Sequence, residues 1–294
     1  MFVILLRTST LIHQYYRMIT LQNISFGYDQ YKLLFDRLDL EIESGQIHGL
    51  LGLNGAGKSS LLHLLQGLRY SHNGKISVNG STPDARSVSF LQDSFLLAEE
   101  VYTPDISVKK FIDRYSPYYP KFRTDSFLKF LNEFELERNS HLGRMSMGQR
   151  KKVMIAFALA TETKVLLMDE PTNGLDIPSK KQFRKILSHI ITDERTFIIS
   201  THQIRDLHSL IDNVIVIQDG KIIFNQSIQS ILDYLHFSLD RNSLSEEGVI
   251  YKERVPGGFL HIRPKQNLES FEPDLEVLFN AIVTKGQIIN QVFA

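Results

Sequence analysis

The stretch GLNGAGKSS, residues 52–60, sets three glycines around an alanine and ends on a lysine and two serines. Glycines lack a Cβ, so backbone N–H groups can converge on one point, and such a point binds an anion. The spacing of Gly52, Gly57, Lys58 and Ser59 matches G-x-x-x-x-G-K-[ST], the P-loop pattern. In that pattern the lysine reaches the β- and γ-phosphates and the hydroxyl reaches Mg²⁺. A flexible glycine turn is the alternative interpretation, and chance produces this pattern in only about one chain in a hundred of this length.

The residues on either side predict a strand before the loop and a helix after it. Residues 45–51 (GQIHGLL) read as a short buried strand, and residues 58–68 (KSSLLHLLQGL) are apolar at helical spacing. The loop then meets a helix N-terminus, where unpaired N–H groups and the helix dipole favour phosphate. We therefore expect one continuous segment to hold a nucleotide: Gly52, Leu53, Asn54, Gly55, Ala56, Gly57, Lys58, Ser59 and Ser60.

Length and composition narrow the class of protein. With 294 residues, the chain can form one large domain with an appendage or two domains. Lys plus Arg and Asp plus Glu are each 33, so the charge balance gives no case for a nucleic-acid partner, and none is expected. The absence of cysteine excludes disulfides and thiolate chemistry and fits a reducing compartment. No apolar run approaches the roughly 18 residues of a membrane span, so we expect a chain that does not cross a membrane by itself.

The pattern along the chain predicts an α/β fold. Short β-like runs with turns occupy residues 19 to about 90, a helical insert follows over about 95–155, and strand-like apolar runs then return. Continuous apolar runs alternating with helices indicate a parallel sheet covered on both faces. We expect an N-terminal extension over 1–17, a main domain over 18–235, and a small C-terminal α+β appendage over 236–294 with a hairpin at Gly257-Gly258.

A pair of carboxylates follows one of the predicted strands. In VLLMDE, four apolar residues precede Asp169 and Glu170, so both acids emerge at the carboxyl end of a buried strand. Parallel sheets present their ligands at this end. Beside a P-loop, Asp169 would complete Mg²⁺ binding, and Glu170 would orient and polarise an attacking water. A solvated acidic turn is the alternative for an isolated Asp-Glu pair.

Between these two motifs lies RMSMGQRKK, residues 144–152. Ser146 by itself would be an ordinary helix N-cap. With both other motifs in place, the chain resembles the nucleotide-binding subunit of an ABC transporter, whose signature is Ser-Gly-Gly-Gln after a leucine. This chain keeps Ser146, Gly148 and Gln149 and has Met147 where the family has its first glycine. The resemblance covers about residues 18–235.

Further positions match motifs of that family. Gln92, in FLQDSF, matches the loop that senses Mg²⁺ or water and joins the core to the helical insert. Residues 174–176 (GLD) match the loop that contacts the partner subunit, and His202 matches the switch histidine near the γ-phosphate. Each has an ordinary alternative: a surface glutamine, a turn with a helix cap, and a structural histidine at a strand end.

An aromatic residue is expected to stack on adenine. Tyr28, in FGYD, matches the family position, and Phe26 and Tyr31 are alternatives. An aromatic side chain near a strand end is also common in protein cores.

The resemblance implies a P-loop NTPase of ABC type that binds ATP and Mg²⁺ and hydrolyses the ATP. In its fold, a mainly parallel core sheet carries an antiparallel β subdomain and a helical insert. It implies that Ser146, Gly148 and Gln149 close on the nucleotide of a second subunit. The catalytic residues would be Glu170, His202 and Gln92, and the metal ligands would be Ser59, Gln92 and Asp169.

The resemblance also implies partners and a location. We expect a homodimer or heterodimer of ATPase subunits, held on the cytoplasmic face of a membrane by a separate permease. The insert (YSPYYPKF) and the ending (DLEVLFNAIV) resemble ATPase subunits of ABC-2-like exporters.

One alternative function is that of a soluble ABC ATPase in repair or translation, although residues 52–169 hold no sustained heptads and the chain has one cassette. A P-loop phosphotransferase is another rival, but it would not need the SMGQ helix.

Overall fold

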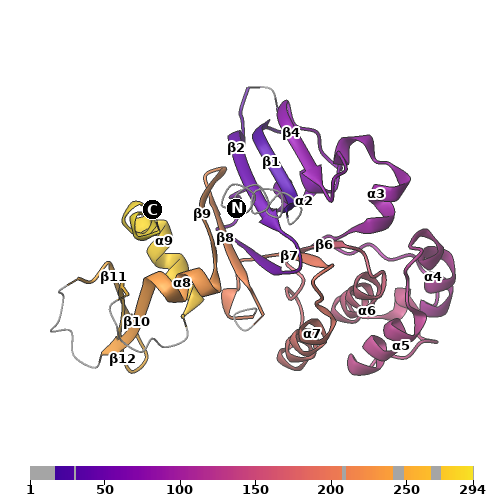
Figure 1. Cartoon of the computed structure of the whole chain (residues 1–294). Helices are drawn as coiled ribbons and strands as arrows, with labels where there is room; N and C mark the ends of the chain where they lie inside the picture. Colours follow the sequence, from indigo (N-terminus) through magenta and orange to yellow (C-terminus); the bar gives the residue numbers. More distant parts are fainter. Residues whose placement is uncertain (1–16, 30, 207–209, 241–247, 266–272, 294) are drawn as a thin grey trace, which may run out of the picture.

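The computed structural model describes residues 17–29, 31–206, 210–240, 248–265 and 273–293 (Figure 1). Its central sheet has six strands in the order β5-β6-β7-β3-β8-β9. The first five strands are parallel, and β9 returns antiparallel to β8 through the Asp219-Gly220 turn. The predicted mainly parallel sheet is confirmed. The strands are β3 (Ile47–Leu51), β5 (Ser94–Leu97), β6 (Val165–Asp169), β7 (Thr196–Thr201), β8 (Asn213–Gln218) and β9 (Lys221–Ser227).

A second, antiparallel sheet lies over one face of the central sheet. It has the order β2-β1-β4, with β1 (Arg17–Phe26), β2 (Phe35–Glu43) and β4 (Asn73–Val78). Helix α2 (Lys58–Leu65) packs in the core that the two sheets share, together with α3 (Val88–Asp93). This is the antiparallel subdomain that the sequence predicts.

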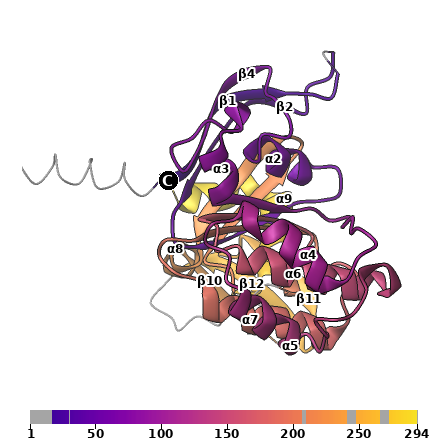
Figure 2. The same cartoon turned by 90° about the vertical axis from the view of Figure 1, so that its right-hand side faces the viewer.

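The other face of the central sheet is covered by helices. Figures 1 and 2 show α4 to α7 on the side opposite β1, β2 and β4. Alternate residues of β6 serve the two cores: Val165 and Leu167 face the antiparallel sheet, whereas Leu166 and Met168 face the helices. A strand buried on both sides needs apolar residues at every position, which explains the run VLLM. The helices are α4 (Val108–Tyr115), α5 (Thr124–Glu133), α6 (Met147–Ala160) and α7 (Ile177–Ile190). Short 3₁₀ turns are η1 (Pro83–Ala85), η2 (Ser116–Tyr118), η3 (Leu142–Arg144) and η4 (Ile204–Asp206).

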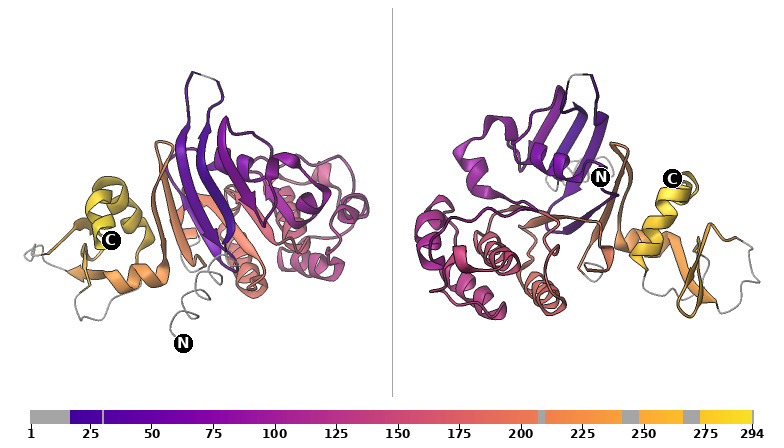
Figure 3. Two further views of the ribbon diagram at one scale, coloured as in Figure 1. Left: turned by 45° about the horizontal axis from the view of Figure 1, so that its top comes forward. Right: turned by 180° about the vertical axis from the view of Figure 1, so that it is seen from behind.

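The C-terminal part lies at the far end of the molecule from α4 and α5 (Figure 3). It contains α8 (Ile228–Tyr234), β10 (Leu235–Asp240), β11 (Tyr251–Val255), β12 (Gly258–Pro264) and α9 (Leu275–Val292), with the sheet order β10-β12-β11. The predicted hairpin is present one residue earlier than expected: β11 and β12 are joined by Pro256-Gly257, and Gly258 is the first residue of β12. Helix α9 packs on β9, where Asn290 Nδ2 donates to the Ile223 carbonyl at 3.0 Å.

Residues 1–16 of the expected N-terminal extension lie outside the described residues. Arg17, which we also expected in the extension, is the first residue of β1 and pairs with Glu43 of β2. In the described parts of the chain, no helix combines the length and the apolarity that a membrane span requires.

A buried histidine in β3 predicts a pH dependence of stability. His48 is 1% exposed, and burial lowers its pKa to about 4. Between pH 6.5 and 4 the unfolded chain therefore takes up a proton that the folded chain does not, and stability falls as the pH falls. We expect the free energy of unfolding to drop between pH 7.5 and 5 by about 2 kcal/mol more in wild type than in His48→Gln. Urea titrations at both pH values measure this, and parallel losses in the two proteins would contradict it.

Candidate nucleotide-binding site

A cavity of about 800 Å³ opens where β3, β6 and β7 end. Because these strands are parallel neighbours, the segments that follow them meet at one edge of the sheet. The cavity is lined by Tyr28, Asp29, Lys32, Leu33, Leu34, Asn54, Gly55, Gly57, Lys58, Ser59, Ser60, Glu99, Glu170, Asn173 and His202. Nine predicted site residues are therefore brought together: Tyr28, Asn54, Gly55, Gly57, Lys58, Ser59, Ser60, Glu170 and His202.

The predicted phosphate loop joins β3 to α2. Gly55 and Gly57 have positive φ angles of 82° and 109°, which favour glycine. A Cβ on Gly57 would also lie 2.6 Å from Phe35 Cε1. Lys58 is the first residue of α2, and its Nζ folds back to donate to the carbonyls of Gly52 (2.9 Å) and Leu53 (3.3 Å). The loop therefore surrounds the ammonium group and places it at the cavity wall.

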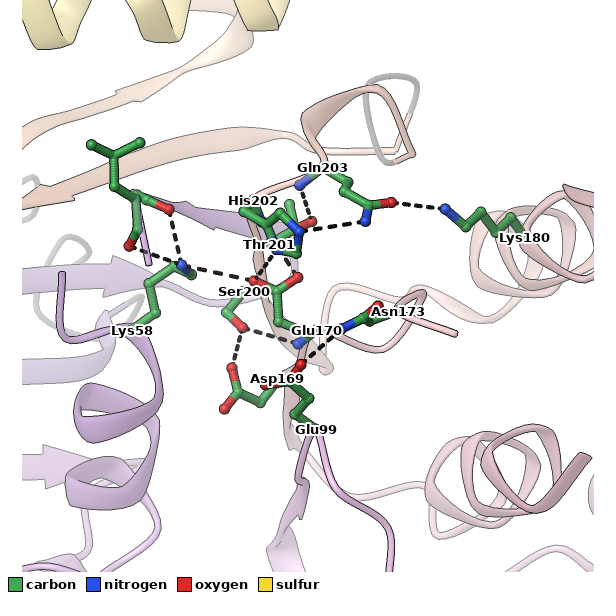
Figure 4. Close-up of polar contacts among 12 residues, drawn as sticks. Lys58, Glu99, Asp169, Glu170, Asn173, Lys180, Ser200, Thr201, His202 and Gln203 are labelled. Atoms are coloured by element: carbon green, nitrogen blue, oxygen red, sulfur yellow. Dashed lines mark hydrogen bonds and ion pairs between the residues drawn. The ribbon is translucent and has the colours of Figure 1, made fainter. Parts of the chain in front are cut away.

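The second half of the site comes from the ends of β6 and β7 (Figure 4). Glu170 Oε1 lies 3.7 Å from Lys58 Nζ and 2.9 Å from His202 Nδ1. The backbone N–H of Glu170 donates to Ser200 Oγ at 3.1 Å, and that hydroxyl donates to Asp169. Ser200 therefore holds the two acids in their relative positions.

The two acids differ in their access to the cavity. Glu170 lines it, whereas Asp169 is 4% exposed and is not among the lining residues. Glu170 also has a positive φ of 45°, a conformation that is uncommon outside glycine.

The three aromatic candidates for stacking on adenine differ in burial and in whether they line the cavity. Tyr28 lines the cavity, and its hydroxyl is 2.8 Å from Ser60 Oγ. Phe26 is buried at 3% exposure and packs edge-on against Tyr28, while Tyr31 is 91% exposed and does not line the cavity. Tyr28 is thus the aromatic residue of the three that can meet a ligand.

Comparison with known proteins identifies the family of this site. The model of the ABC transporter family matches residues 35–173. The "Probable sulfate/thiosulfate import ATP-binding protein CysA" of Chlorella vulgaris is 32% identical over 225 residues, which cover 74% of this chain and 94% of that protein. The chain belongs to the ABC transporter ATP-binding proteins.

Two further comparisons agree with this. A "Putative ABC transporter ATP-binding protein" of Bacillus cereus is 28% identical over 241 residues, covering 79% of this chain, although the chain spans only 42% of that relative's length. A solved ATP-binding cassette, a dimer in a post-hydrolysis state bound to ADP and Pi, matches with a TM-score of 0.64 at 21% identity. The match covers 71% of this chain and 98% of that one, which confirms the predicted fold.

The structure corrects the assignment of Gln92. We expected Gln92 in the loop that senses Mg²⁺ or water and joins the core to the helical insert, but Gln92 lies in α3, which ends before β5 begins. It sits at the amino end of β5, whereas the cavity lies at the carboxyl ends, so Gln92 can serve neither as a catalytic residue nor as a metal ligand here. The side chain of Ser87 caps α3 by accepting from the Phe90 N–H, and this cap makes the apolar run VSFLQD helical.

Glu99 lies where we expected Gln92. It follows β5 and lines the cavity, and its Oε1 accepts from Asn173 Nδ2 at 2.8 Å. Our sequence reasoning missed both residues. The signal was present, because FLLAEE repeats the arrangement of VLLMDE: an apolar strand followed by two acids.

In the structure, the residues that match the ABC signature form the N-terminal cap of α6. Ser146 is the N-cap of α6, and its Oγ accepts from the Gln149 N–H while Gln149 Oε1 accepts from the Ser146 N–H. Met147 is 67% exposed, and a Cβ on Gly148 would approach the Gly174 carbonyl to 3.2 Å. Ser146, Gly148 and Gln149 do not line the cavity of their own chain.

Two sets of predicted site residues remain: the loop residues outside the cavity lining and the expected metal ligands. Gly52, Leu53 and Ala56 belong to the same loop but do not line the cavity. In the described residues, no group of three or more His, Cys, Asp or Glu side chains is arranged to hold a metal by itself. Mg²⁺ takes only a few oxygen ligands from a protein and the rest from phosphates and water. Ser59 and Asp169 supply oxygens of this kind.

Proposed function

We propose that this chain binds Mg-ATP in the cavity and hydrolyses it to power a membrane transporter. The observation that carries this is the cluster of Lys58, Glu170 and His202, in which one carboxylate contacts both the ammonium and the imidazole beside the loop that ends at Lys58. Such a cluster places a base, an ammonium group and an imidazole where a terminal phosphate would lie.

Each residue then has a separate task. The N–H groups of the loop and Lys58 hold the phosphates, and Tyr28 stacks on the base. Glu170 orients and deprotonates the attacking water, and His202, held by Glu170, stabilises the charge that develops on the γ-phosphate. Bound Mg²⁺, held by Ser59 and Asp169, would neutralise phosphate charge during the transfer.

We propose that a second ATPase subunit completes the site. Ser146 and Gly148 lie away from their own cavity, and the exposed start of α6 offers a hydroxyl and N–H groups for the phosphates of a facing chain. Two-fold symmetry lets one surface serve both sites, in a homodimer or a matched heterodimer. ATP would then hold the dimer closed, and its hydrolysis would let the dimer open.

The membrane partner would be a separate permease, with this chain on its cytoplasmic face. We propose export as the direction, on the resemblance of the insert and of the C-terminal helix to exporter subunits. One relative is named for import, so the direction needs its own measurement: uptake of the cargo into inside-out vesicles supports export.

The transport proposal has a direct test. The tagged chain is expressed with its neighbouring genes in a membrane-containing host, solubilised in detergent and purified. Co-purification of an integral membrane protein, with ATP hydrolysis that needs Mg²⁺, is the expected result. A chain that hydrolyses ATP but purifies without any membrane protein would instead indicate the soluble ABC ATPase, and a chain without Mg-dependent ATP affinity would overturn both functions.

Because Glu99 lines the cavity and Gln92 does not, we expect substitution of Glu99 to lower the rate of ATP hydrolysis and substitution of Gln92 to leave it unchanged. Glu99→Ala removes a side chain that lines the cavity and the acceptor for Asn173, so we expect the rate of ATP hydrolysis to fall about tenfold. Gln92→Ala changes the surface of α3 and should leave the rate within about twofold of wild type. Steady-state phosphate release measures both, and the reverse order would restore Gln92 to the site.

A further inference from the structure

Helix α6 carries a buried lysine, Lys151, whose ammonium group contacts the backbone of two residues that line the cavity. Lys151 is 4% exposed, although lysine is rarely buried without a partner. Its Nζ donates to the carbonyl of Glu170 at 2.7 Å and to the carbonyl of Glu99 at 3.2 Å. One side chain thus holds the segment after β5 and the segment after β6.

The carboxylates around Lys151 stabilise its ammonium group in this buried position. Burial lowers its pKa, and the carboxylates of Glu99, Glu170 and Asp169 act in the opposite direction. The ammonium therefore sits in a negative environment, and its N–H groups donate to the backbone oxygens of Glu99 and Glu170. These contacts leave the Glu170 carboxylate free to face Lys58 and His202.

The backbone at Glu170 needs such support. Its φ of 45° is left-handed, and a residue of this kind holds that conformation only when its surroundings fix it. The Glu170 N–H is held by Ser200, and its carbonyl is held by Lys151, so both sides of the residue are fixed. Asn173 adds two hydrogen bonds to this arrangement. Its backbone N–H also donates to the Glu170 carbonyl, and its side-chain amide donates to the Glu99 carboxylate.

Lys151 also lies close to the signature cap. It is five residues after Ser146, which is about 7.5 Å along a helix axis. A helix of this length moves as one body, so a displacement at its first residues reaches Lys151 and then the backbone of Glu170.

We propose that Lys151 is a positioning residue, which sets the carboxylate of Glu170 and ties it to the start of α6. Contact of Ser146 with the nucleotide of a facing subunit is then relayed to the Glu170 of the same chain. This inference rests on the proposed ATPase function. It concerns the placement of the base, so it predicts a loss in kcat without a loss in ATP affinity.

The test compares two neighbouring lysines of α6. Lys151→Met keeps an unbranched side chain of similar length and removes the donors, and we expect kcat to fall about 10- to 100-fold. ATP affinity by calorimetry should stay within about twofold, because Lys58 and the phosphate loop are untouched. Lys152→Met is the matched control: Lys152 Nζ also donates to a carbonyl, that of Phe134 at 3.2 Å, but in the helical insert. Its kcat should stay near wild type.

Two more measurements separate positioning from general stability. Lys151→Arg retains N–H donors and should restore kcat to within about threefold of wild type. With ATP, the Lys151→Met protein should form a dimer that outlives the wild-type dimer in light scattering, because closure remains and hydrolysis is slow. If Lys151→Met has a lowered melting temperature, Lys151→Gln replaces it, since its shorter side chain carries an uncharged amide NH₂ in place of the ammonium.

Three outcomes would overturn the inference: a Lys151→Met kcat equal to that of Lys152→Met, a kcat that falls together with ATP affinity, or no recovery in Lys151→Arg. Wild type and Glu170→Gln run in the same assay. A wild type without ATPase activity would refute the proposed function itself, whereas an active wild type beside a fully active Lys151→Met would refute only the role of Lys151.

Discussion

Glu170→Gln is expected to reduce the steady-state rate of ATP hydrolysis by a factor of about 10² to 10⁴, the range that a general base contributes. The amide keeps the shape of the side chain but cannot accept the proton of the attacking water. Binding of ATP should persist, because the phosphate loop and Lys58 remain in place. The variant should therefore accumulate as a closed, ATP-bound dimer, seen as a doubled mass in light scattering when ATP is added.

The chain offers a matched control for this substitution. Glu135 also has a left-handed backbone, with a φ of 56°, but it is exposed and follows α5, away from the cavity. Glu135→Gln should hydrolyse ATP at the wild-type rate. An unchanged rate for Glu170→Gln in the assembled complex would remove Glu170 from its assigned role.

Lys58→Ala is expected to weaken ATP binding about 100-fold, which corresponds to about 2.8 kcal/mol. The ammonium group is lost from the phosphate site, and the carbonyls of Gly52 and Leu53 lose the donor that folds the loop around it. Glu170 also loses the cation 3.7 Å from its Oε1, which adds an uncompensated negative charge beside the phosphates. Isothermal calorimetry with ATP and Mg²⁺ measures the affinity directly.

Lys109→Ala controls for the loss of a lysine in the first turn of a helix, since Lys109 is exposed in α4. Its affinity for ATP should match wild type. Normal ATP binding by Lys58→Ala, with the control unchanged, would overturn the assignment of residues 52–60 as the phosphate loop.

Patterns that are local in sequence were predicted well. The strand, glycine loop and helix of residues 47–65 lie within one short segment, as does the strand that leads into the acid pair, and glycine spacing or apolar runs specify each of them. The cap at Ser146 was predicted in the same way, because an N-cap depends on residues three positions apart. The β11–β12 hairpin follows from two adjacent glycines, which take positive φ values.

The error at Gln92 shows the limit of this reasoning. The run SVSFLQDSFLL is apolar enough for a strand throughout, and periodicity over so short a segment does not separate strand from helix. The cap of Ser87 makes its first half helical, and pairing with β6 makes Ser94–Leu97 the strand. The residue that reaches the site is therefore Glu99, which follows the strand.

The sequence by itself determined the kind of chemistry in this protein: a phosphate loop, two acids after a buried strand, and a capped signature helix, each written within about ten residues. Tertiary structure alone decided which further side chains join them. Glu99, Lys151 and Ser200 join Glu170 and His202 because β5, β6 and β7 are parallel neighbours whose carboxyl ends share one edge, with α6 packed against them. Hydrogen bonds between such residues depend on strand order, and strand order comes from burying apolar faces across the whole chain.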